Sequence, residues 1–154
     1  MDHADQHRPL AAYTAIIAAF NALAAAGLVV AHRRGRLPER FSAGDIALAG
    51  AASYRLARLV ARDRVTSGLR APFTRFQDDA GHGEVDEAAR GRGVQRAIGE
   101  LLVCPNCVGL WVAAGFTGGL VAAPRVTRTV AAGFTIEGIA DALQLAAAAA
   151  NQAV

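Results

Sequence analysis

The chain has 154 residues, a net charge of +3 and 53% hydrophobic residues, with a mean hydropathy of +0.27. This hydropathy is high for a soluble domain, and the aromatic content of 6% is too low for a large soluble core. Two cysteines three positions apart exclude the disulfide framework of a small secreted domain. We therefore predict an all-α, helical integral membrane protein with a single membrane domain over residues 1–154.

The first expected element is a membrane-spanning helix over residues 10–31, which carry no charge. At about 1.5 Å per residue, a helix of this length crosses a hydrocarbon layer of about 30 Å. A cleaved signal peptide is the alternative, because small residues at 22–26 suit a peptidase. The preceding head is acidic, with Asp2 and Asp5, which favours a retained helix.

A basic connector over residues 32–40 leads to a second expected helix at about 45–62, where Ser42 or Asp45 can cap the first turn. The apolar stretch 46–54 is too short to cross a bilayer. Arg55, Arg58 and Arg62 follow at helical spacing on one face. We predict a partial or interfacial helix. The alternative is a spanning helix whose arginines are paired inside a helical bundle.

A polar region is expected over residues 63–99, with a mobile acidic loop at 77–87. Its arginines are candidate contacts for anionic lipid headgroups, because guanidinium groups bind phosphates through two hydrogen bonds. These candidates are Arg62, Arg64, Arg70 and Arg75. In the structural alternative, Asp63 pairs with Arg64 or Arg70 and ends the helix. No glycine-rich phosphate loop follows a strand, so nucleic acid is not an expected partner.

The second expected span, residues 101–123, begins with Cys104-Pro105-Asn106-Cys107. Pro105 suits the first helical turn, and free amide groups there stabilise a thiolate at Cys104. A zinc site needs about four ligands, so a partner or second subunit would have to complete one. The remaining interpretation is that both thiols are small, buried packing groups. The motif is also similar to that of glutaredoxins, although no βαβ pattern surrounds it.

The last expected span, residues 130–150, follows a short connector at 124–129 and carries Glu137 and Asp141 on one face. Acids facing lipid are costly, so Arg55 and Arg58 are their natural partners. The result is a structural charge network or, alternatively, a proton or ion path. In the preceding span, Gly115 and Gly119 form a GxxxG pair that permits close helix packing.

Arginine distribution predicts the orientation. If helix 45–62 does not cross the membrane, 13 arginines lie in residues 32–100, which favours a cytoplasmic location for that segment. The N-terminus is then outside, and the membrane is the bacterial cytoplasmic (inner) membrane. If helix 45–62 does cross, this bias nearly vanishes.

Three segments resemble an uncharacterised family of small bacterial multi-pass membrane proteins, which includes a sporulation-associated membrane protein of bacilli. They are Arg62-Asp63-Arg64-Val65-Thr66-Ser67, the segment Leu69 to Phe73, and the segment Cys104 to Trp111 with its Cys-Pro-x-Cys-x-Gly-x-Trp pattern. An acid before Leu-Gln-Leu, at Asp141 to Leu145, is also similar. The resemblance covers about residues 45–150. It implies an integral membrane location and no activity.

We expect a non-enzymatic accessory or assembly subunit of a membrane complex, without catalytic residues or a cofactor. Its partners would be the lipid bilayer and another membrane protein or a second copy of the chain. One alternative is a membrane-bound thiol-redox or metal-binding module that uses Cys104 and Cys107. The other is a small oligomeric ion channel or carrier that uses Glu137 and Asp141.

Overall fold

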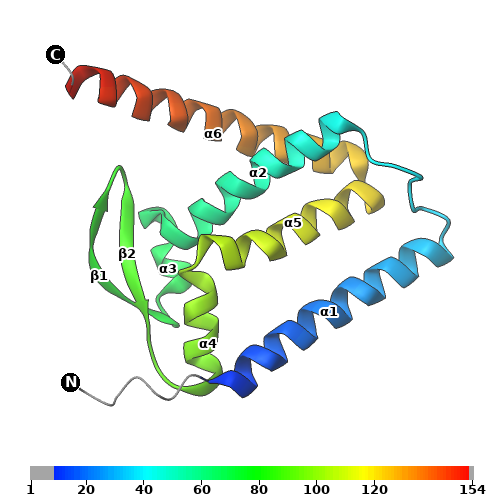
Figure 1. Ribbon diagram of the computed structural model, residues 1–154, viewed down its shortest axis with the longest axis horizontal. Coiled ribbons are helices and arrows are strands. Elements are labelled where there is room, and N and C mark those ends of the chain that lie inside the picture. The colour runs from blue at the N-terminus through cyan, green and yellow to red at the C-terminus, as the bar shows by residue number, and fades with distance from the viewer. Residues whose placement is uncertain (1–8, 153–154) are drawn as a thin grey trace. The chain divides into compact units, whose positions relative to one another are not determined.

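The computed structural model describes residues 9–152, and its contacts group into two compact units. One unit contains the chain up to Gly27 and residues 58–108, and the other contains residues 28–57 and 109 onward. The fold is mostly helical, with one small sheet (Figure 1). The elements are α1 (Leu10–Arg33), α2 (Ala43–Arg62), η2 (Arg64–Thr66), α3 (Ser67–Arg70), β1 (Thr74–Gly81), β2 (Glu84–Ala89), α4 (Gly93–Leu102), α5 (Pro105–Ala122) and α6 (Pro124–Gln152).

Three of these helices, α1, α5 and α6, are long and apolar enough to cross a membrane. They correspond to the three expected spans, with shifted ends. Helix α5 begins at Pro105, because proline lacks an amide proton and suits a first helical turn. Helix α4 ends at Leu102, so the expected span 101–123 is broken at residues 103–104. Pro124 likewise begins α6, and the expected connector 124–129 is helical.

The prediction of an all-α fold was wrong over residues 74–89. The expected mobile acidic loop is an antiparallel hairpin, in which Thr74 pairs with Ala89 and Gly81 with Glu84. Its two-residue turn consists of His82 and Gly83, with φ angles of 49° and 79°. Positive φ at both positions matches the twist of a tight hairpin, and the glycine makes this turn accessible. The acidic residues on both strands are typical of a solvated loop, so the sequence did not indicate a hairpin.

Helix α4 packs against the base of the hairpin within the first unit. Gly99 is buried there, and a Cβ atom at this position would overlap the carbonyl oxygen of Phe73 and lie 3.0 Å from the Cβ of Ala89. Arg90 donates its backbone N–H to the same carbonyl at 2.9 Å. The absence of a side chain at Gly99 therefore permits the helix to approach the hairpin.

In the second unit, α2 forms a core with α5 and α6. Its buried centre consists of Ala52, Phe116 and Ala131, one residue from each helix. The first turn of α2 is capped as expected, since Ser42 Oγ accepts the N–H of Asp45 at 3.0 Å. The small residues on α2 allow close contact with its neighbours.

Candidate functional site

The most completely buried polar group in the described chain is Arg70, at the end of α3. Its side chain is 1% exposed, and that of Glu87 on β2 is 4% exposed. Arg70 Nε donates to Glu87 Oε2 at 2.9 Å, and Nη2 donates to Oε1 at 3.1 Å. This two-point geometry is the strong form of an arginine–carboxylate pair.

Arg70 also donates to the end of α2, to the residue before η2 and to η2 itself. Nη1 donates to Val60 O and to Thr66 Oγ1, both at 2.6 Å, and Nη2 donates to Asp63 O at 3.2 Å. Val60 is in the last turn of α2, where a positive charge is favourable. Arg70 therefore ties the end of α2 to the hairpin.

The Glu87 carboxylate is held in its charged form. Burial raises the pKa of Glu87. Hydrogen bonds from Arg70, Thr74 and Ser67 lower it, and together they outweigh burial, so the pKa lies below the ordinary value of 4.5. Thr74 Oγ1 donates to Glu87 Oε2 at 2.6 Å. The site is thus a closed ion-pair cluster.

This arrangement corrects the expectation that Arg70 contacts lipid headgroups, because its guanidinium is enclosed by protein. Two other expected headgroup ligands have acidic partners on the hairpin: Arg62 pairs with Asp86 at 2.8 Å and Arg64 with Asp79 at 2.6 Å. Arg75 is exposed on β1. Arg58 pairs with Glu84 of the hairpin.

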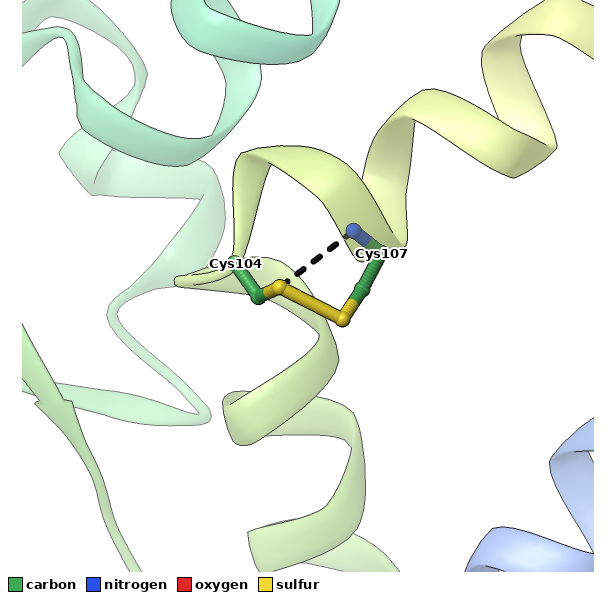
Figure 2. The surroundings of a disulfide bond; sticks show 2 residues. All are labelled: Cys104 and Cys107. Atoms are coloured by element: carbon green, nitrogen blue, oxygen red, sulfur yellow. Dashed lines mark hydrogen bonds between the residues drawn. A yellow bond between two sulfur atoms is a disulfide. The ribbon is translucent and has the colours of Figure 1, made fainter.

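The cysteine motif forms a disulfide at the start of α5. Figure 2 shows Cys104 and Cys107 joined across one helical turn, with their Cα atoms 5.2 Å apart. The N–H of Cys107 donates to Cys104 Sγ at 3.3 Å. Cys107 is exposed and Cys104 is half-buried, so the structure does not show the pair as buried packing groups. Within residues 9–152, no three His, Cys, Asp or Glu side chains are placed to hold a metal ion.

One pair of the expected charge network is present in the structure. Arg55, with 10% of its side chain exposed, forms an ion pair with Glu137 of α6, in which Nη2 donates to Oε1 at 2.6 Å. Asp141, one turn further along, takes no part in this pair. A second pair, which the sequence did not indicate, joins Arg128 Nε to Asp45 Oδ1 at 2.7 Å.

The two glycines of the GxxxG motif differ in their surroundings. A Cβ at Gly119 would lie 2.6 Å from Thr127 Oγ1 on α6, whereas one at Gly115 would meet nothing within 4 Å. A Cβ at Gly138 of α6 would make a less severe contact, 3.3 Å from Arg55 Cβ. Gly119 therefore serves the packing of α5 on α6, and Gly115 does not.

Sequence reasoning missed Glu87 and Glu84, the acids that organise the arginines. Both lie on β2, Glu84 directly before Val85 and Glu87 two residues after it, and Val85 is 2% exposed. A valine between two acids is an alternating pattern that indicates a strand, but one such residue is too short a pattern to predict a strand without the hairpin.

A comparison with known families assigns residues 48–147 to the family described as "Protein of unknown function (DUF1360)". The chain belongs to this family. The matched region begins in α2 and ends in α6, so it includes the Arg70 cluster, the hairpin and the disulfide. The predicted membership in an uncharacterised family with a sporulation-associated member is confirmed.

The sporulation protein YjcA of Bacillus subtilis (strain 168) is similar to this chain, with 38% identity over 71 residues. The alignment covers 44% of this chain and 60% of the relative, so the similarity spans somewhat more than half of that protein. No solved structure matches the chain.

Proposed function

We propose that this member of the family is a non-enzymatic integral membrane protein of the bacterial cytoplasmic membrane, which acts as an accessory or assembly subunit. The observation that carries the proposal is the exposure of the apolar helices. Of the most apolar stretches of α1, α5 and α6, 0%, 11% and 6% respectively are buried within the chain. Such surface requires acyl chains or another apolar protein surface to cover it.

The polar region supports a structural role for the segments shared with the family. Arg70 and Glu87 form hydrogen bonds with each other and with neighbouring protein groups. A buried, fully paired cluster fixes a fold, whereas a catalytic group must reach a substrate. The segments around Arg62 and Leu69 are accordingly proposed to hold the hairpin at the cytoplasmic membrane surface.

Reconstitution of the purified full chain into liposomes tests this function. We expect no ion flux and no turnover from the chain alone. In mild detergent we expect a particle that contains a second copy or a stoichiometric membrane partner. Flux or turnover by the isolated chain would contradict an accessory role, and a strictly monomeric, partner-free particle would contradict an assembly role.

A second function is supported by the disulfide, whose Cys107 is exposed: thiol–disulfide exchange with a protein dithiol. A donor thiolate attacks one sulfur of the Cys104–Cys107 bond, the S–S bond breaks, and its electron pair leaves on the other sulfur. The donor's second thiol then resolves the mixed disulfide. The donor is oxidised to a disulfide, and the two cysteines gain two electrons and two protons. The N–H of Cys107 stabilises a thiolate on Cys104.

Thiol titration at controlled redox potential separates the two functions. Reversible release of two thiols, abolished in Cys104→Ser and in Cys107→Ser, supports exchange. Copurified zinc that is lost in both variants would instead indicate a site completed by a partner or a second copy. A disulfide that no dithiol reduces in the folded protein would leave the pair structural.

A further inference from the structure

Helix α2 lies along two helices that are themselves candidate membrane spans. Thr135 of α6 donates its hydroxyl to Leu48 O at 3.2 Å, and a Cβ at Gly109 of α5 would lie 3.8 Å from the Cβ of Ala57. With the shared core at Ala52, these contacts make α2 parallel to α6 and antiparallel to α5 (Figure 1). Helix α2 is therefore a packed member of this group of helices.

The charges that make α2 too polar to span by composition have partners. Near its start, Asp45 accepts hydrogen bonds from Arg128 at 2.7 and 2.9 Å. Further along, Arg55 pairs with Glu137. A lone charge in hydrocarbon is costly, and a nearby opposite charge reduces that cost. Both ion pairs connect α2 to α6, so each helix supplies the countercharge for a charged residue of the other.

The last arginines of α2 lie at its C-terminal end. Arg58 and Arg62 pair with Glu84 and Asp86 of the hairpin. This position suits the headgroup level, where arginine side chains reach polar surroundings. With 20 residues, α2 is about 30 Å long, so its two ends, with Asp45 near one and Arg62 at the other, reach about the two boundaries of a hydrocarbon layer about 30 Å thick.

The opposite face of α2 is apolar and exposed. It consists of residues at helical spacing, Ile46, Ala47, Gly50, Ala51 and Tyr54. Ile46 and Tyr54 are 64% and 66% exposed. We propose that α2 crosses the membrane beside α5 and α6 as a fourth spanning helix, and that this face contacts lipid acyl chains. The inference rests on the proposed membrane location and revises the expected partial helix and N-out orientation.

Because a crossing helix has its two ends on different sides, residues 34–42 and 63–102 face opposite sides of the membrane. The three-span arrangement places both segments in the cytoplasm. The position of these two segments therefore decides between the arrangements.

Labelling with a membrane-impermeant maleimide measures this position. In the Cys104→Ser/Cys107→Ser chain, single cysteines are introduced at exposed sites, Glu39→Cys in the connector and Ala80→Cys on the hairpin. We expect one site to react in intact spheroplasts and the other to react only after permeabilisation. Reaction of both sites under the same condition would overturn the proposal.

A second pair, Leu37→Cys and Ala88→Cys, repeats the comparison in case one substitution disturbs folding. Extraction of the same membranes at alkaline pH separates the two levels of the argument. A chain that stays in the membrane but labels on one side only contradicts the fourth span alone. A chain released from the membrane contradicts both the proposed function and this inference.

Discussion

Arg70 and Glu87 form a two-point ion pair from which solvent is almost excluded, although they are separated by a whole strand and a turn in the sequence. The pair joins the end of α2 to β2 through hydrogen bonds from Arg70 to Val60 O and to Glu87. Because both segments lie in the region shared with the family, the cluster is a structural feature that other members can be tested for.

Substitution of Glu87 by glutamine should destabilise the fold strongly. The guanidinium of Arg70 would remain buried without its countercharge, at a cost of about 3–5 kcal/mol. Chemical unfolding in detergent measures this change. The matched control is Asp79→Asn, which removes the partner of Arg64 in a pair whose side chains are 62% and 61% exposed. We expect that control to cost less than about 1 kcal/mol. Equal effects would contradict the burial of the Arg70 cluster.

The contribution of Glu87 should depend on pH in one direction. Its folded-state pKa lies below the ordinary value of 4.5, so the unfolded chain takes up a proton first as the pH falls. Its stabilisation is complete well above pH 4.5 and is lost as the pH falls through the lower folded-state pKa. The difference in unfolding free energy between wild type and Glu87→Gln should therefore shrink in acid. A difference that grows below pH 4.5 would contradict the lowered pKa.

Gly99→Ala should disrupt the packing of α4 on the hairpin. The added methyl group would overlap the carbonyl oxygen of Phe73, and a backbone atom cannot rotate away. We expect a loss of about 1–3 kcal/mol, as for other overpacked sites, measured as a lower unfolding midpoint. The control is Gly68→Ala, since a Cβ there meets nothing within 4 Å. A tolerated Gly99→Ala would show that α4 does not approach the hairpin this closely.

The two glycines of the GxxxG motif should respond differently to alanine. At Gly119 the methyl group would displace Thr127, whose hydroxyl donates to Ala123 O at 3.0 Å, and would separate α5 from α6. Gly119→Ala should lower the midpoint of thermal unfolding in detergent. Gly115→Ala should leave it unchanged or raise it slightly, because alanine favours the helix by up to about 1 kcal/mol. A destabilising Gly115→Ala would contradict the open space around that glycine.

The long apolar helices could be predicted because long apolar runs with few or no charges determine them locally. The Ser42 cap of α2 was predictable for the same reason, since the cap depends on residues within one turn. The exact helix ends were less accessible. A proline can lie in the first turn of a helix, but the sequence does not show whether the preceding residues form a separate helix. In the structure, Pro105 and Pro124 each begin a helix.

The hairpin and the buried cluster could not be predicted, because their stability comes from residues distant in sequence. The acids of β1 resemble those of a solvated loop when the strand sequence is considered by itself. Their placement in a strand is favoured by ion pairs with arginines such as Arg64, which lies outside the strand. Arginine is also rarely enclosed, so nothing local distinguishes Arg70 from Arg75. The carboxylate that permits its burial lies on another element.

The single tryptophan, Trp111 on α5, permits the most direct test of the membrane location that the account proposes. The full chain in vesicles of phosphatidylcholine brominated on the acyl chains is compared with the same chain in unbrominated vesicles. The account predicts strong quenching of Trp111 fluorescence by the brominated chains and weak quenching by aqueous iodide. Quenching by iodide without quenching by brominated lipid would contradict the account.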